Sequence, residues 1–187
     1  MKRVMLIVAY DGTNYAGWQI QPNAVTIEEV LNRTLSELLQ EEITVIGASR
    51  TDSGVHALGN VAVFDTSSKI PGEKISYALN QRLPKDIVIQ DSREVPLDFH
   101  PRHCNSKKTY QYQILNKRFP VPTKRLYAHF VHYPLNTEAM QEASSYLIGE
   151  HDFKSFCSMK TQAESTVRTI YDIRVQKDGD MITITIS

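Results

Sequence analysis

The chain has 187 residues, with 21 basic and 21 acidic side chains, so its formal net charge at pH 7 is zero. This balance excludes a polycationic nucleic-acid arm and an acidic tail, although local charged patches are compatible with it. A content of 41% hydrophobic and 22% charged residues is typical of a soluble globular chain with one large domain or two small ones.

Cysteine use and hydropathy indicate the compartment. Cys104 and Cys157 lie far apart and form no CxxC pair, which favours a reducing environment over a secreted disulfide framework. No stretch approaches the roughly 20 apolar residues of a membrane span. The short apolar run after Arg3 has no signal-peptide cleavage site. We therefore predict a cytoplasmic protein that is not inserted in a membrane.

The first half of the chain predicts a β-α-β-β-α-β unit. Residues 4–9 form a continuous apolar run, which is typical of a strand buried on both faces. A helix begins after Thr26, whose hydroxyl can cap it while Glu29 reaches back, and it carries one apolar stripe. The other predicted elements are strands at 43–46, 60–64 and 87–90 and a helix at 73–81. This is the order of a ferredoxin-like unit.

The second half begins the same order again. The predicted elements are a strand at 109–115, a helix at 137–147 ending at Gly149, and strands at 170–176 and 181–186. Tyr110, Tyr112 and Ile114 alternate onto one face of the first of these strands. Asp178 and Gly179 are a strong hairpin signal between the last two. A second unit of the same order would need one more helix and one more strand, so we expect this half to be incomplete.

Charge is unevenly distributed along the chain. Residues 99–137 contain no Asp or Glu, but they carry seven basic side chains with several aromatic residues between them. The seven are Arg102, Lys107, Lys108, Lys117, Arg118, Lys124 and Arg125. Cations that pair with phosphates, beside rings that stack on bases, suit an RNA surface. A solvated face whose aromatic residues belong to the core would give the same pattern, because alternating tyrosines also favour strands.

The polar loop after the second predicted strand is the strongest candidate for chemistry. It brings Arg50, Asp52 and His56 into one short segment. A guanidinium two residues away can keep a carboxylate ionised, and an ionised, positioned aspartate can act as a nucleophile. Residues 52–54 are also ordinary turn chemistry, and the residues alone favour the turn.

Two other segments carry weaker signals. Residues 10–21 hold the only tryptophan and two glycines but lack the spacing of a phosphate-binding loop, so we interpret them as a connection held by local packing. His100, His103 and Cys104 lack the spacing of a zinc site, and we predict no metal.

Several motifs in sequence order resemble those of one enzyme family. They are YDGTNYAGWQIQ at 10–21, RTDSGVHA at 50–57, FHPR at 99–102, KTYQY at 108–112 and GEHDF at 149–153. Together they resemble the tRNA pseudouridine synthases of the TruA type, which modify the anticodon stem-loop. They span nearly the whole chain, and RTDSGVHA is specific enough to outweigh the turn interpretation.

The resemblance implies a fold and a function. It implies conversion of uridine to pseudouridine at tRNA positions 38 to 40, without cofactor or metal, by a homodimer that holds the tRNA. It implies an α+β fold in which two ferredoxin-like halves, residues 1–98 and 99–187, form one antiparallel sheet. In this family pattern Asp52 matches the catalytic aspartate, Arg50 the arginine that fills the stack when the target base leaves, and Tyr110 the tyrosine that packs against the uracil.

The sequence also departs from the family pattern. Ser49, Asn60 and Pro101 stand where glycine, glutamine and alanine are usual, but none of these changes removes a catalytic group. The resemblance further implies a later segment whose arginine pairs with the catalytic aspartate, so we expect the chain as given to have little activity. The alternatives are a non-catalytic RNA-binding protein, although no RNP1-like octapeptide is present, and a metal-dependent hydrolase.

Overall fold

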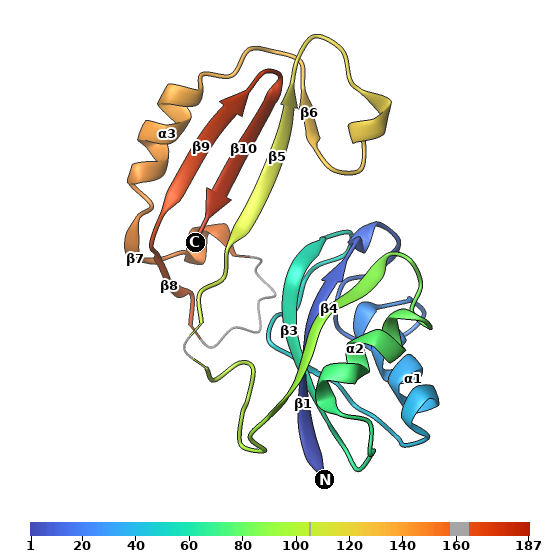
Figure 1. Ribbon diagram of the computed structural model, residues 1–187. Coiled ribbons are helices and arrows are strands. Elements are labelled where there is room, and N and C mark those ends of the chain that lie inside the picture. The colour runs from blue at the N-terminus through green and yellow to red at the C-terminus, as the bar shows by residue number, and fades with distance from the viewer. Residues whose placement is uncertain (105, 158–164) are drawn as a thin grey trace. The chain divides into compact units, whose positions relative to one another are not determined.

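The chain forms two compact units in the computed structural model, Met1–Asn105 and Ser106–Ser187 (Figure 1). The structure describes residues 1–104, 106–157 and 165–187. Each unit combines helix with sheet, so the predicted α+β class is confirmed. Within the described residues, no helix has the length and apolar character of a membrane span.

The first unit follows the predicted order of elements. They are β1 (Lys2–Tyr10), α1 (Ile27–Leu39), β2 (Ile46–Gly47), β3 (Ala57–Thr66), α2 (Gly72–Asn80) and β4 (Ile87–Val95), with a short 3-10 helix, η1 (Gly12–Asn14). The strands form an antiparallel sheet in the order β2-β3-β1-β4. The first and last strands of the unit are therefore neighbours, and the ends of this sheet are β2 and β4.

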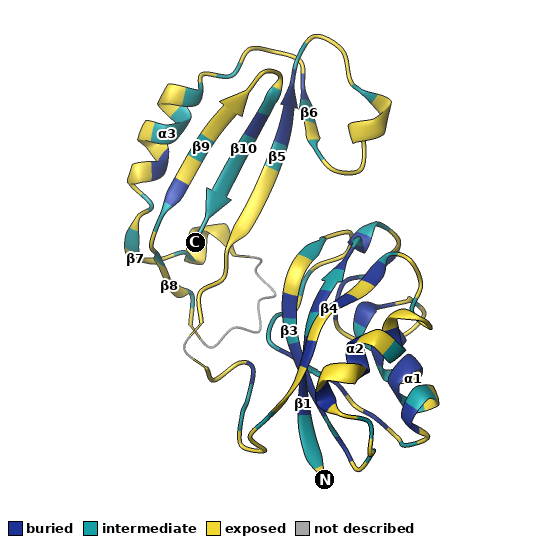
Figure 2. Cartoon of the chain, viewed as in Figure 1, coloured by how far each residue is buried: buried dark blue, intermediate teal, exposed yellow. Residues whose placement is uncertain are grey.

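The two helices cover one face of this sheet (Figure 2). The α1 helix begins as predicted, because the Thr26 hydroxyl accepts a 3.3 Å hydrogen bond from the Glu29 N–H. Its apolar stripe packs against alternate β1 side chains, of which Val4, Leu6 and Val8 are fully buried. The prediction that β1 is buried on both faces is only partly correct. Ile7, on the opposite face, is partly exposed, because the helices cover only one side.

The second unit contains more strands than predicted. Its elements are β5 (Tyr110–Asn116), η2 (Pro122–Lys124), β6 (His129–Val131), α3 (Thr137–Ser145), β7 (Gly149–Asp152), η3 (Lys154–Phe156), β8 (Val167–Ile170), β9 (Ile173–Asp178) and β10 (Met181–Ile186). The main sheet has the order β6-β5-β10-β9, and β7 pairs with β8. The hairpin around Gly179 is confirmed. The predicted strand at 170–176 is instead divided between β8 and β9.

The pairing of β6 with β5 is parallel, which differs from the predicted antiparallel arrangement. The expectation of one continuous sheet concerns both units together and stays a prediction. Asn116, at the end of β5, holds the segment that contains β6. Its side-chain amide donates to the carbonyls of Val131 at 3.1 Å and Tyr133 at 2.7 Å, and its carbonyl accepts from the Leu135 N–H at 3.3 Å. A buried amide thus replaces hydrogen bonds that a longer strand would make.

We expect Asn116→Ala to lower the free energy of unfolding of the second unit by about 2 kcal/mol. The substitution removes the partner of the buried Val131 carbonyl and of two part-buried backbone groups, at Tyr133 and Leu135. A buried group left without a partner costs about 1–3 kcal/mol. Urea unfolding followed by circular dichroism measures the change. Gln111→Ala, at an exposed position of the same strand, is the control. Equal stability of the two variants would show that the Asn116 hydrogen bonds do not hold β6.

Candidate active site

The loop between β2 and β3, residues 48–56, is the candidate catalytic loop. Burial alternates along its first half, where Ser49 and Thr51 are partly buried and Arg50 and Asp52 are exposed. The Asn60 amide donates to the Ser49 carbonyl at 3.0 Å. The two residues that face the protein are therefore the fixed ones, and they turn Arg50 and Asp52 toward solvent.

The first loop, residues 11–18, lies directly against the candidate catalytic loop. The backbone N–H of Trp18 donates to the Thr51 carbonyl at 3.0 Å. Gly17 permits this contact, because a Cβ at this residue would overlap the Thr51 carbonyl oxygen and its φ of +85° is unfavourable for other residues. The Tyr10 and Thr51 hydroxyls, which lie next to these backbone contacts, are 2.9 Å apart and hydrogen-bonded.

The second half of the candidate catalytic loop is also held by the first loop. The Tyr15 carbonyl accepts hydrogen bonds from the Gly54 N–H at 3.2 Å and from the Ser53 hydroxyl at 3.3 Å. The Val55 N–H donates to the Asp52 carbonyl at 3.2 Å, which closes a turn around the aspartate. The turn that the sequence predicts at residues 52–54 is therefore formed, and it leaves the Asp52 side chain exposed.

The Trp18 side chain packs against the residue that precedes the candidate catalytic loop. It is 1% exposed and lies 6.0 Å from the Tyr10 ring, measured between centroids. A Cβ at Gly47, the last residue of β2, would lie 2.5–2.6 Å from three atoms of the indole. Only glycine at this residue lets the strand pass so close to the ring. The Trp18 ring thus sets the position of the end of β2, where the loop begins.

The Asp52 carboxylate has no hydrogen bond or ion pair within the described residues. The predicted pairing with Arg50 is therefore not formed there, because both side chains point outward from adjacent fixed residues. His56, at the end of the loop, has two close neighbours instead. Its Nδ1 accepts from the Gly12 N–H at 3.1 Å and lies 3.0 Å from the Asp11 Oδ1.

The segment 99–102 belongs to the same unit as the loop. The Arg3 guanidinium makes two hydrogen bonds to the Asp65 carboxylate, at 2.7 and 2.8 Å, and a third to the Phe99 carbonyl at 2.9 Å. The Arg102 Nε donates to the Gly47 carbonyl at 2.9 Å. Arg102, predicted as an RNA-binding residue, is thus bonded to the strand that leads into the candidate catalytic loop.

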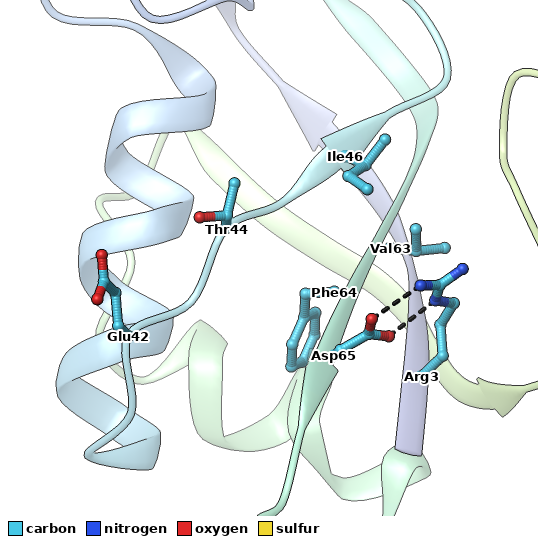
Figure 3. A pocket seen from close by; sticks show the side chains of 7 residues that line it. All are labelled: Arg3, Glu42, Thr44, Ile46, Val63, Phe64 and Asp65. Carbon is cyan, nitrogen blue, oxygen red and sulfur yellow. Dashed lines mark hydrogen bonds and ion pairs between the residues drawn. The ribbon is translucent and has the colours of Figure 1, made fainter. Parts of the chain in front are cut away.

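A pocket of about 240 Å³ lies beside the Arg3–Asp65 pair (Figure 3). Its lining residues are Arg3, Glu42, Thr44, Ile46, Val63, Phe64 and Asp65. None of them belongs to the candidate catalytic loop. Within the described residues, no three His, Cys, Asp or Glu side chains come together as a metal site would require.

The other predicted site residues lie in the second unit, around β5 and η2. Tyr110, the first residue of β5, is 59% exposed. The cations differ in their contacts. Lys107 lies 4.1 Å from the centre of the Tyr171 ring, Arg118 lies 5.0 Å from that of Phe119, and Lys117 pairs with Asp180 at 2.6 Å. The Arg125 guanidinium bonds to the Pro122 carbonyl of its own turn at 3.2 Å, whereas Lys108 and Lys124 are exposed side chains.

The pairing register places Tyr110 on a particular face of its sheet. Tyr110 lies opposite Ile186, and Ile114 lies opposite Ile182. Alternate residues of a strand share a face, so Tyr110 lies on the same face as the Ile114 core cluster. It stands beyond that cluster, where the face is open to solvent.

Comparison with known proteins identifies the class. A profile of the tRNA pseudouridine synthase family matches residues 6–103 and 143–187, which include the first loop, the candidate catalytic loop and the last strands. The chain belongs to this family. The family and the enzyme class predicted from the sequence motifs are therefore confirmed.

Individual relatives are similar over almost the whole chain. A tRNA pseudouridine synthase A from Thermoanaerobacter sp. (strain X514) is 51% identical over 186 residues, which cover 100% of this chain and 76% of the relative. One from Acetivibrio thermocellus is 48% identical over 182 residues, or 97% of this chain and 75% of the relative. A tRNA pseudouridine synthase A 2 from Clostridium perfringens is 45% identical over 187 residues, or 100% and 77%.

Residues 10–21 carry one of the family motifs, but their residues alone favoured a connection held by local packing. In the structure Tyr10, Gly17 and Trp18 contact the candidate catalytic loop. The signal was a lone tryptophan beside glycines in a polar segment. Without the structure, nothing indicated which segment these residues would contact.

We expect the Arg3–Asp65 pair to contribute to stability at neutral pH and to be lost in acid. The hydrogen bonds from Arg3 hold the pKa of the Asp65 carboxyl below its usual value of about 4. Because the folded-state pKa is lowered, the contribution is present above about pH 4 and disappears as the pH falls through the folded-state value. Asp65→Asn should therefore be less stable than the wild type at pH 7 and equally stable near pH 2.

Urea midpoints at a series of pH values measure this difference. Asp91→Asn, which removes an exposed carboxylate from β4, is the control and should follow the wild type. A constant difference between Asp65→Asn and the wild type at all pH values would show that the ion pair is not responsible.

Proposed function

We propose that the protein isomerises uridine to pseudouridine at positions 38 to 40 of the tRNA anticodon stem-loop, with Asp52 as the catalytic residue. The observation that carries this proposal is the exposed Asp52 carboxylate on a loop whose neighbouring residues are fixed. A catalytic group needs this combination, because it must reach a large substrate and still keep its position within a fraction of an ångström.

The chemistry agrees with such a residue. The reaction breaks the C1′–N1 and C5–H bonds of uridine and forms a C1′–C5 and an N1–H bond. The hydrogen leaves C5 as a proton and the oxidation state does not change, so the reaction requires no electron carrier. The target base must first leave the helical stack, at a cost of a few kcal/mol. The Asp52 carboxylate then assists the breaking of the glycosidic bond, and the freed uracil turns and reattaches through C5.

The two other site residues have complementary roles in this proposal. Arg50 occupies the place that the target base leaves in the stack. Its exposed side chain, two residues before Asp52, supports this role. Tyr110 packs against the uracil, and its 59% exposed ring offers the required surface. Stacking of a base on a ring recovers about 1–3 kcal/mol, which offsets part of the cost of unstacking.

The proposal includes an architecture and a location. Residues 1–98 correspond to a ferredoxin-like half and residues 99–187 to a second, incomplete one, and the sheets of the two halves join into one in a cytoplasmic homodimer. The strand order β2-β3-β1-β4 with two helices on one face supports a ferredoxin-like first half. The tRNA lies along the basic and aromatic block of residues 99–137.

We expect Asp52→Asn to reduce tritium release from tRNA labelled with [5-³H]uridine by more than about a thousandfold, because the amide cannot replace the carboxylate. Binding of tRNA should change by less than about threefold. The assay compares residues 1–187 with a form extended by the part of the Thermoanaerobacter relative that this chain does not cover. Asp91→Asn is the matched control.

Unchanged tritium release by Asp52→Asn would exclude the proposed role of the aspartate. Binding of tRNA without any release by either wild-type form would favour a non-catalytic RNA-binding protein. Abolition of release by a chelator would favour a metal-dependent reaction.

We expect Lys124→Ala to weaken tRNA binding more than Lys117→Ala does. The Lys117 ammonium is paired with Asp180 at 2.6 Å, so its charge is already partly neutralised, whereas Lys124 is exposed at the end of the 3-10 helix η2. Each phosphate contact that is lost should reduce the slope of log K against log salt by about 1. Lys85→Ala, outside the basic block, is the control. Equal slopes for all three variants would exclude Lys124 as a phosphate contact.

A further inference from the structure

The position of Asp52 depends on its neighbours in the chain. Its carboxylate makes no hydrogen bond or ion pair within the described residues, and its side chain is exposed. The backbone on either side must therefore fix it. On the C-terminal side, the fixed contact is the turn closed by the Val55 N–H. On the N-terminal side, the contacts converge on Thr51.

Thr51 is held by its backbone and by its side chain. Its carbonyl accepts from the Trp18 N–H at 3.0 Å, and its hydroxyl is hydrogen-bonded to the Tyr10 hydroxyl at 2.9 Å. The backbone hydrogen bond holds the main chain of residue 51 against the first loop. The side-chain hydrogen bond is a second attachment point, so the two together restrain both the position and the orientation of this residue.

Tyr10 is well suited to hold another residue. It is the last residue of β1, it is 4% exposed, and its ring packs near Trp18. Burial raises the pKa of its hydroxyl, so the group stays protonated. A buried hydroxyl without a partner is costly. The Tyr10 hydroxyl has two polar neighbours, the Thr51 hydroxyl at 2.9 Å and the Asn60 side chain, and it is thereby tied both to the candidate catalytic loop and to β3, which follows it.

We propose that the Tyr10–Thr51 hydroxyl pair positions the Asp52 carboxylate for catalysis. The inference rests on the proposed function, in which Asp52 is the catalytic residue. Tyr10 and Thr51 are positioning residues, which act through the backbone of the loop and do not contact the uridine. They connect the rigid end of the central strand β1 to the residue next to the reacting group.

The pair should affect the chemical step more than tRNA binding. Apart from Arg102, the proposed phosphate contacts lie in the second unit, and none of them bonds to Tyr10 or Thr51 within the described residues. A displacement of the carboxylate by about 1 Å can lower a rate by up to a hundredfold without weakening binding. The Trp18–Thr51 backbone bond can still form in the variants but should open more often, so we expect the loop to keep its fold and to lose part of its restraint.

The experiment measures tritium release in the two forms of the protein described above, with Tyr10→Phe, Thr51→Val and the double variant. Each single substitution should lower kcat about tenfold, with KM for tRNA changed less than twofold. The double variant should be no slower than either single one, because both remove the same bond. Thr51→Ser keeps the hydroxyl and should restore kcat to within about twofold of the wild type.

Thr34→Val is the matched control. It removes a buried threonine hydroxyl that donates to the Val30 carbonyl at 2.7 Å within α1, outside both loops. It should lower stability to a similar extent but leave kcat per folded molecule unchanged. Multiplied losses in the double variant, or a kcat for Tyr10→Phe equal to that of Thr34→Val, would overturn the proposal.

A second measurement requires no turnover. The rate of hydrogen exchange at the Trp18 amide, which bonds to Thr51, should rise at least about fivefold in Tyr10→Phe and stay unchanged in Thr34→Val. Unchanged exchange in Tyr10→Phe would overturn the positioning role. Faster exchange without tritium release by the wild type would instead contradict the proposed function, so the two failures are distinguishable.

Discussion

The close approach of two loops determines the arrangement of the candidate active site. The first loop lies so near the candidate catalytic loop that Gly17 has no space for a side chain, and the Trp18 indole leaves none at Gly47. Backbone hydrogen bonds to Thr51 and from Gly54 then fix the catalytic loop at two points. Because these contacts are short and directional, the loop can be exposed and still be well positioned.

The two units contribute different kinds of residue. The first has a large continuous core, and its loops carry Arg50 and Asp52 on fixed backbone. The second has a small core around Ile114 and Ile182 and many exposed aromatic and basic side chains. A large core favours precise placement of a chemical group, whereas an open surface with cations and rings favours contact with a polyanion. This division agrees with a family that modifies tRNA.

Local signals predicted some elements well and others poorly. The capped helix α1 and the hairpin at Gly179 depend on residues close in sequence, and both were predicted correctly. The parallel strand β6 and the β7–β8 pair were missed. Their pairing depends on contacts such as those of Asn116, which join segments more than ten residues apart. Arg102 was assigned to RNA from its charge, but its hydrogen bond to Gly47 required the folded chain.

The sequence alone determined the family, the α+β class and the residue proposed for catalysis, because RTDSGVHA and its companion motifs are specific and contiguous. The sequence also showed that a net charge of zero is compatible with a basic block at residues 99–137. The tertiary structure decided what holds that residue: Tyr10, Gly17 and Trp18, which lie 33 to 41 positions before Thr51 in the chain, contact Thr51. Such contacts depend on the antiparallel pairing of β1 with β3, and the pattern of either segment by itself does not specify which atoms that pairing brings together.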